Sequence, residues 1–429
     1  MPDYKKRKVH RMRASASKHT RVRKEKIKIE FDDEEPQKRE TEKSEAKVRV
    51  ITGKKIIRRK RMRTFAVALA AILVVVIVLQ TLLPMGIAET LGNFTSTFGK
   101  GSFPIELYGT EAMETVTKSN YFYVLTDSQL EAVSSGGKKI WSLSHGYASP
   151  ILKTSETRAF LFDQNGSKAV IYNLEGAVNE IETETNILTA AIARNGSYAV
   201  ATRSTEYASV VSVYDKKDHL LYEWYSATGT VIATALSPDG KKLAVATVFA
   251  TDGHLSSKLL ILDYDSADPI FTADFVDRPI YRLESEKAGI TVCTENSYSF
   301  ISWKKFERTD YSSDRSLAIA RSSSVGTLLA FNRKANQADN KIVLFSKKGQ
   351  KQAEFDFNGI ISDIVAAKNH IYCISDTKEY LFDRTGKLIR SAECGFGAVK
   401  LAVISADEVA VISNGAISRL ELTAKKGDS

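Results

Sequence analysis

Residues 237–247, "SPDGKKLAVAT", bring together residue types that can do chemistry: an aspartate, a glycine and a lysine beside a proline. A carboxylate and an amine held on a glycine loop could bind phosphate or a carboxylate. The same residues also suit a tight turn that leads into a buried strand, which needs no chemistry. The first interpretation favours an enzyme and the second a scaffold, so the rest of the sequence must decide between them.

Relatives of this stretch occur elsewhere in the chain, as "ARNGSYAVAT" and "SSVGTLLAF". Their glycines, Gly196, Gly240 and Gly326, are separated by 44 and 86 residues, which are one and two units of about 43 residues. Each copy joins small polar residues to a residue suited to positive φ and then to an apolar run, as a hairpin turn requires. Repetition therefore favours a structural role for Asp239 and Lys241.

A second pattern lies out of phase with the first, for example as "VYDKKD" and "LFDRTG". It consists of an apolar residue, Tyr or Phe, then Asp, Asn or Ser, two further residues, and Gly or Asp. An Asx or Ser residue that opens a type I turn closed by a left-handed residue explains these choices. The closing positions of this second turn are Gly137, Gly176, Asp218, Gly349 and Gly386.

The two turns and the strands between them define a repeated unit of about 41 residues, the size of one propeller blade. Residues 103–424 read as strands throughout, which predicts an all-β fold, a β-propeller of about eight four-stranded blades, with seven as the alternative. Because the last unit ends early, "SFPIELYG" near residue 105 is expected to supply its missing strand and close the ring. Units are expected to start near residues 112, 150, 188, 231, 279, 316, 360 and 398.

Upstream of the repeats, residues 65–83 form a 19-residue apolar run in which only Gln80 and Thr81 are polar. A helix of this length covers roughly 28 Å, close to the thickness of a membrane's hydrocarbon core, which predicts one transmembrane helix. Its length and long upstream segment favour a retained signal-anchor over a cleaved signal peptide. Seven basic residues directly precede it: Lys54, Lys55, Arg58, Arg59, Lys60, Arg61 and Arg63.

This charge asymmetry places the N-terminus in the cytoplasm and the propeller outside, in a single-pass protein of the cell membrane. Residues 1–64 hold 24 Lys or Arg against 10 Asp or Glu and are expected to be a disordered cytoplasmic tail. The tail is expected to contact anionic lipid, with a docking site for a cytoplasmic or nucleic-acid partner as the alternative. Residues 84–102 are interpreted as a flexible linker, and residues 425–429 as a disordered C-terminus.

The chain as a whole also resembles known families. The second turn is similar to the repeat of quinoprotein-like propellers, with Trp141 at the end of its strand, and "SPDG" is similar to the turn of WD40 and TolB-like propellers. The Gly-His and Trp-Asp dipeptides of WD40 repeats are absent. With its basic tail and single span, the chain resembles a family of uncharacterised membrane-anchored propellers of clostridial Gram-positive bacteria. That resemblance implies a location and a fold, and no activity.

Candidate chemistry in the propeller is sparse. No HExxH, GxSxG, P-loop or dinucleotide motif occurs, and the spacing in "DYDSADP" lacks the glycine and distal Glu of a calcium loop. Cys293 and Cys373 lie in apolar runs and are interpreted as core residues. We therefore predict no catalytic residue, metal ligand or cofactor. The histidines available to the exterior domain are His145, His219, His254 and His370.

These observations predict a non-catalytic binding scaffold that holds a protein partner or a cell-envelope polymer on a propeller face, with no specific nucleic-acid partner. The alternative is a cell-envelope enzyme, a hydrolase or a quinoprotein relative, with its site in the central channel. Charged side chains that converge on the channel would favour the enzyme, and an apolar or small-residue channel would exclude it.

Overall fold

The structure, a computed structural model, describes residues 53–82, 85, 87–99, 101–375, 377–394 and 397–420. The described residues contain two helices, α1 (Gly53–Leu82) and α2 (Ile87–Ser96). The predicted disordered tail lies outside the described residues as far as residue 52, whereas its last part, residues 53–64, is helical and belongs to α1. The predicted disordered C-terminus also lies outside the described residues. α1 includes residues 65–82 of the expected span. No helix in the described part of the chain is both long and apolar enough to cross a membrane.

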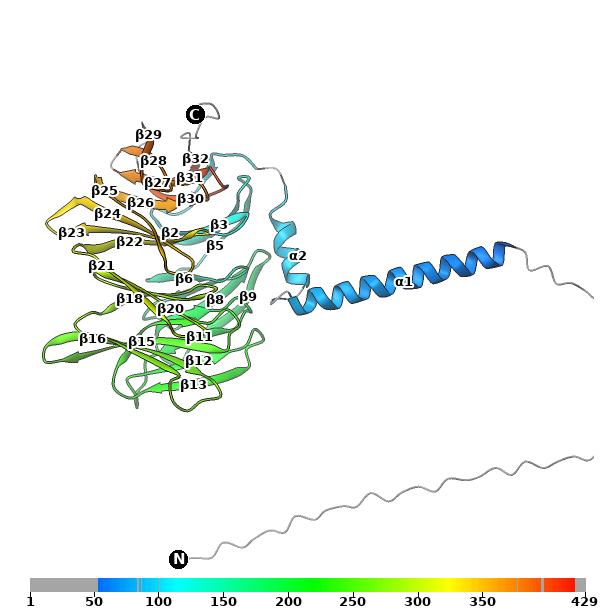
Figure 1. The fold of residues 1–429 in the computed structure, drawn as a ribbon, viewed down its shortest axis with the longest axis horizontal. Coiled ribbons are helices and arrows are strands. Elements are labelled where there is room, and N and C mark those ends of the chain that lie inside the picture. The colour runs from blue at the N-terminus through cyan, green and yellow to red at the C-terminus, as the bar shows by residue number, and fades with distance from the viewer. Residues whose placement is uncertain are drawn as a thin grey trace, which may run out of the picture. The chain divides into compact units, whose positions relative to one another are not determined.

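Within the described residues, 32 strands form eight four-stranded antiparallel sheets (Figure 1). Each sheet is one blade, which confirms the predicted eight-bladed propeller. The strands of blades 1 to 4 are β2 (Ala112–Thr117), β3 (Tyr121–Thr126), β4 (Gln129–Ser134), β5 (Lys139–Ser144), β6 (Pro150–Thr154), β7 (Ala159–Asp163), β8 (Lys168–Asn173), β9 (Gly176–Glu182), β10 (Ile187–Ile192), β11 (Tyr198–Thr202), β12 (Ser209–Tyr214), β13 (Leu220–Ser226), β14 (Thr230–Leu236), β15 (Lys242–Thr251), β16 (His254–Asp263) and β17 (Phe271–Phe275).

Blades 5 to 7 continue the pattern, and blade 8 combines both ends of the propeller. Every blade begins within one residue of its predicted start. The remaining strands are β18 (Ile280–Ser285), β19 (Gly289–Thr294), β20 (Ser297–Ser302), β21 (Arg308–Ser312), β22 (Ser316–Ser322), β23 (Gly326–Arg333), β24 (Asn336–Ser346), β25 (Lys351–Asn358), β26 (Ile361–Ala366), β27 (His370–Ser375), β28 (Lys378–Asp383), β29 (Leu388–Glu393), β30 (Ala398–Val403), β31 (Val409–Ser413), β32 (Ala416–Arg419) and β1 (Ile105–Glu106).

Blade 8 closes the ring. Its sheet has the order β1-β32-β31-β30, so that the first strand of the propeller pairs with the last. Ile105 lies opposite Ile417, and the Leu107 amide donates to Gly415 O at 3.0 Å. The expectation that "SFPIELYG" supplies the missing strand is confirmed. This pairing joins the first and last strands of the propeller in one sheet and so closes the ring.

The core lies between blades. Buried side chains of one sheet pack against those of the next, as Val211 and Val213 of blade 3 do in a cluster with Leu236 and Leu243 of blade 4. In strand β12 the side chains alternate between buried and half-buried, the two-residue period of a strand. No blade buries its own faces, so stability depends on neighbours on both sides.

The segment 84–102 differs from its interpretation as a flexible linker. Residues 87–96 form α2, and α2 is attached to the propeller by hydrogen bonds from several side chains. The Gly, Ser and Thr residues of this segment suggest flexibility when taken alone. Partners from distant parts of the chain offset that intrinsic preference.

The glycines of the first turn allow the left-handed backbone that this turn requires. Gly240 has φ +68°, and a Cβ added there would meet the Asn195 amide. Gly253, at the tip of the β15–β16 hairpin, has φ +81° with open space around it. Substitutions at the two glycines can therefore distinguish the cost of a left-handed backbone from the cost of steric overlap.

We expect Gly240→Ala to lower the free energy of unfolding by about 3 kcal/mol, because the left-handed backbone disfavours a Cβ and the displaced Asn195 amide loses a hydrogen bond. Gly253→Ala, the matched control, should cost about 1 kcal/mol from the backbone alone. Urea unfolding of both variants measures the difference. Equal costs would contradict tight packing between turns of adjacent blades.

Candidate functional site

The propeller has two different ends. The side that we call the turn end carries, in each blade, the connection between the first and second strands and the connection between the third and fourth strands. The loop end carries the connections between second and third strands and between successive blades. In the described residues, the turn-end connections hold 15 Lys or Arg and 11 Asp or Glu, whereas the loop-end connections hold 4 and 8. The turn end is therefore net basic and the loop end net acidic.

α2 lies on the turn end, over blades 1 and 2. Arg158, between β6 and β7, binds Glu89 of α2 through Nε and Nη2, each at 2.8 Å. Asn93 donates to Thr157 O at 3.3 Å and accepts from the Leu174 amide at 2.9 Å. All three propeller residues lie in turn-end connections, so the loop end remains uncovered by α2.

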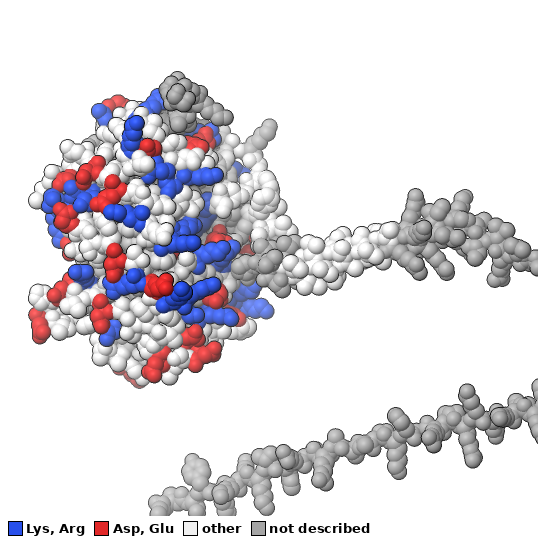
Figure 2. Space-filling model, viewed as in Figure 1, with Lys and Arg blue, Asp and Glu red and all other residues white. Residues whose placement is uncertain are grey.

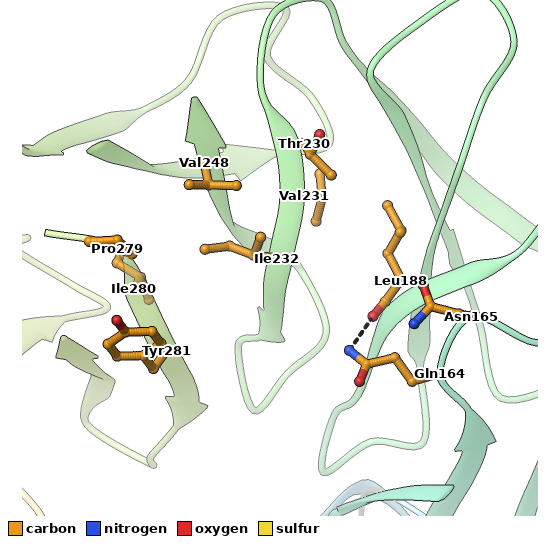
Figure 3. A pocket seen from close by; sticks show the side chains of 10 residues that line it. All are labelled: Gln164, Asn165, Leu188, Thr230, Val231, Ile232, Val248, Pro279, Ile280 and Tyr281. Atoms are coloured by element: carbon orange, nitrogen blue, oxygen red, sulfur yellow. Dashed lines mark hydrogen bonds between the residues drawn. The ribbon is translucent and has the colours of Figure 1, made fainter. Parts of the chain in front are cut away.

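A hollow of about 350 Å³ opens on the loop end, among blades 2 to 5 (Figure 3). The first residues of β10, β14 and β18 supply most of its wall. The Gln164 side chain donates to Leu188 O at 3.1 Å and so has a fixed orientation at one edge. No charged side chain lines it; its residues are Gln164, Asn165, Leu188, Thr230, Val231, Ile232, Val248, Pro279, Ile280 and Tyr281.

Exposed apolar side chains also lie at the loop end of blades 3 to 5, and one of them, Tyr281, lines the hollow. We call them the loop-end patch: Tyr207, Tyr225, Leu255, Val276 and Tyr281. Val276 is 68% and Tyr281 63% exposed, and the rings of Tyr207 and Tyr225 lie 4.9 Å apart. Large apolar side chains gathered on a surface mark interaction sites, and tyrosine is enriched where proteins bind one another.

Charged side chains gather at the axis of the ring, where the first strands lie innermost. This axial cluster consists of Lys118, Lys153, Arg282, Glu284 and Glu286, contributed by or directly following β2, β6 and β18. Arg282 pairs with Glu284, which also accepts a hydrogen bond from the Ser322 hydroxyl. Lys118 Nζ donates to Thr154 Oγ1 at 2.7 Å. The axis is therefore charged, the arrangement expected to favour the enzyme alternative.

The surroundings shift the pKa values in the axial cluster. Burial lowers the pKa of Lys118 to about 8, against the opposing charge of Glu284. Burial raises the pKa of Glu286 to about 6. For Glu284, burial alone would raise the pKa, but the charges of Arg282 and Lys153 outweigh it and lower the pKa to about 2.

A second axial group, which we call the axial clasp, joins four blades. Arg321 of blade 6 donates from Nη1 to Thr115 O of blade 1 at 2.9 Å and from Nη2 to Thr115 Oγ1 at 2.6 Å. The same guanidinium pairs with Asp363 of blade 7 and donates to Leu401 O of blade 8 at 3.2 Å. Asp363 in turn accepts from the Leu401 amide at 2.8 Å.

The predicted turn residues lie where the repeat places them, at the turn end. All of them have positive φ: Gly137, Gly176, Gly196, Asp218, Gly240, Gly326, Gly349 and Gly386. The predicted basic residues before the span belong to helix α1, but their side chains are not among the parts that the structure describes. They are Lys54, Lys55, Arg58, Arg59, Lys60, Arg61 and Arg63.

The polar groups of "SPDG" are used within the turn. Ser237 Oγ donates to Asp239 Oδ1 at 2.6 Å, and Asp239 Oδ1 also accepts from the Lys241 amide at 3.3 Å. Asp239 O accepts from the Asn195 side chain of the preceding blade at 2.7 Å. The aspartate thus stabilises a turn and a contact between blades.

The histidines stay apart from one another. Three of them pair with an aspartate, as His370 does with Asp407 at 3.1 Å, and His145 bonds to backbone groups. Among the described residues, no cluster of His, Cys, Asp and Glu could hold a metal ion. Cys293 and Cys373 are buried, which raises the pKa of both thiols.

The loop-end patch, the axial cluster and the axial clasp were not predicted from the sequence. Arg321 and Asp363 lie on first strands among small and apolar residues, at positions where a propeller turns side chains toward the axis. The signal that could have found them is a charge inside a buried strand, because such a charge needs a partner.

We expect Arg321→Met to lower the free energy of unfolding by about 3 kcal/mol, because it leaves the Asp363 carboxylate buried without its cation. The Arg321 side chain is 14% and that of Asp363 3% exposed. The control is Arg333→Met, whose pairs with Asp314 and Asp339 are exposed and screened by solvent, so that the free energy of unfolding should change far less. Chemical denaturation compares them, and similar losses would contradict the clasp.

Stability should also depend on pH through the axial cluster. The lowered pKa of Glu284 contributes stability above about pH 4.5 that is lost as the pH falls toward 2. The raised pKa of Glu286 acts in the opposite sense, so its ionisation destabilises the fold above about pH 6. Glu284→Gln should therefore flatten the acid limb of the unfolding free energy, and Glu286→Gln should stabilise the protein at pH 7. If Glu284→Gln and Glu286→Gln changed the free energy of unfolding at pH 7 in the same direction, this assignment would be contradicted.

Comparisons with known proteins agree with the fold. No curated protein matches the chain. The Dos1 propeller is 12% identical with a TM-score of 0.53, over 78% of this chain and 97% of that one. The C-terminal WD40 domain of Sif2 is 12% identical with a TM-score of 0.51, over 75% and 99%. Dihydro-heme d1 dehydrogenase NirN is 13% identical with a TM-score of 0.50, over 72% and 73%.

At these identities the likeness shows the fold alone, and it confirms the resemblance to WD40-type propellers. A protein family provides the closer assignment. The family described as "Family of unknown function (DUF5711)" matches residues 109–422, which contain all blades apart from β1. Because this match covers well over half of the sequence, the chain belongs to the DUF5711 family.

Proposed function

We propose that this chain is a membrane-anchored, non-catalytic scaffold that binds a protein partner through the loop end of its propeller. The proposal is carried by two features of the loop end, the loop-end patch and the uncharged hollow, which share Tyr281. Together they combine tyrosines and aliphatic side chains with a concave surface, the composition of a protein interface. The long β15–β16 hairpin borders this region, since the Asp277 amide donates to Ser256 Oγ at 3.0 Å.

A protein partner suits this site better than a charged polymer. No charged side chain lines the hollow, and the loop-end connections have a net negative charge. An anionic envelope polymer would therefore meet repulsion and few hydrogen-bonding cations. A protein surface with apolar side chains at its centre and basic residues at its rim would be complementary to the loop end.

The membrane anchor is supported by the sequence of α1. Its side chains from residue 65 to residue 78 are exposed, among them Phe65, Leu73 and Ile77. Water does not favour so continuous an apolar surface, whereas a lipid bilayer does. The basic run before it supports a cytoplasmic N-terminus and an extracytoplasmic propeller.

The charged axis favours a second candidate function, a cell-envelope enzyme with its site at the turn-end side of the axis. Lys118 and Glu286 have pKa values near 8 and 6, close to neutrality and suited to proton transfer. The scaffold remains the first choice, because ion pairs and hydrogen bonds already engage Arg282, Glu284 and Lys118 in the folded protein.

We expect the double variant Val276→Arg/Tyr281→Arg to reduce recovery of a cross-linked protein partner by about tenfold or more, because two charges would be buried at the interface. The full chain is cross-linked in membranes, purified in mild detergent and analysed by mass spectrometry. The matched control is Leu220→Arg/Leu388→Arg, which alters residues of similar exposure at the turn end.

Loss of the partner in both double variants would contradict a loop-end interface. Recovery of a carbohydrate polymer in place of protein would contradict the choice of partner. Release of soluble fragments from isolated envelopes by the unaltered chain, abolished by Glu286→Gln, would establish the enzyme instead.

A further inference from the structure

α2 has two chemically different sides. Glu89 and Asn93, four residues apart, lie on one side and bind the propeller. Leu91 and Phe94 lie on the other side, roughly half a helical turn away. Leu91 is 55% and Phe94 51% exposed, and Phe98, directly after the helix, is also exposed. The Phe94 and Phe98 rings pack edge to face with centroids 4.6 Å apart.

The bound side of α2 is fixed firmly. Besides the Arg158–Glu89 pair, Lys138 Nζ donates to Ser96 O at 3.0 Å and to Phe98 O at 2.7 Å, at the C-terminal end of the helix. These carbonyls have no partner within the helix, so the lysine caps it. Asn120 donates to Thr97 Oγ1 at 3.0 Å. The exposed apolar side chains are therefore held outward by the propeller itself.

The chain on either side of α2 indicates what those side chains meet. The apolar segment 65–83 ends four residues before α2 begins, so a bilayer that holds this segment lies within reach of α2. The turn end that carries α2 is net basic when the connections of all eight blades are counted, and Figure 2 shows several Lys and Arg side chains on the part of the propeller that borders α2. An anionic lipid surface is complementary to both features.

We infer that α2 is an interfacial helix that inserts Leu91, Phe94 and Phe98 into an anionic lipid surface. The turn end of the propeller then faces that surface, and the loop end points away from the membrane. This inference rests on the proposed membrane anchor. It goes further by assigning a lipid-binding surface and a fixed orientation to a domain that a flexible linker would leave free to rotate.

A fluorescent probe on α2 tests the inference. The full chain is reconstituted in vesicles of phosphatidylcholine and phosphatidylglycerol that contain brominated lipid. Bimane is attached at Leu91→Cys or, as the control, at Leu255→Cys on the loop end. Both leucines are 55% exposed. Cys394 is replaced by Ser so that it does not react with bimane, whereas Cys293 and Cys373 are buried and are kept. We expect brominated lipid to quench the Leu91 probe about twofold or more and to leave the Leu255 probe unaffected.

Alkaline extraction separates this inference from the anchor on which it rests. Chain that is extracted from the vesicles by carbonate would overturn both the anchor and the inference. Chain that resists extraction but shows equal quenching at the two positions would overturn the inference alone. Disulfide-linked dimers formed through Leu91→Cys would assign the exposed side of α2 to a second copy, and would also overturn it.

Discussion

Closure of the ring is the constraint on which the rest of the structure depends. Each sheet buries its faces only against its neighbours, so an open array would expose one face of its first blade and one face of its last blade. β1 supplies the last strand of blade 8, and the axial clasp ties blades 6, 7, 8 and 1 together around the same junction. A single guanidinium, that of Arg321, thereby bonds to a residue 206 positions away in the sequence.

A closed ring also gives the molecule two separate working surfaces. The turn end is built from short repeated turns, carries the basic excess and binds α2. The loop end does not contain the repeated turn residues, and it carries the hollow and the loop-end patch. Because the two ends are joined by rigid strands, fixing one end to a membrane would fix the direction in which the other points.

The sequence predicts the parts of this structure that depend on local chemistry. Gly196, Gly240 and Gly326 recur at a blade's spacing because each needs a left-handed backbone, and that need is visible in one chain. α2 was missed because its stability comes from Arg158, 69 residues beyond Glu89. The axial clasp was missed for the same reason. The loop-end patch combines residues of blades 3, 4 and 5, which come to the same end of the molecule only after the blades have packed side by side.

We propose that the two ends of the propeller meet different partners, protein at the loop end and lipid at the turn end. Photo-crosslinking in intact cells tests it most directly, with the same photoreactive amino acid placed at Val276 or at Lys217, an exposed turn-end lysine. We expect protein adducts from position 276 and lipid adducts from position 217. Protein adducts from position 217 with none from position 276 would contradict it.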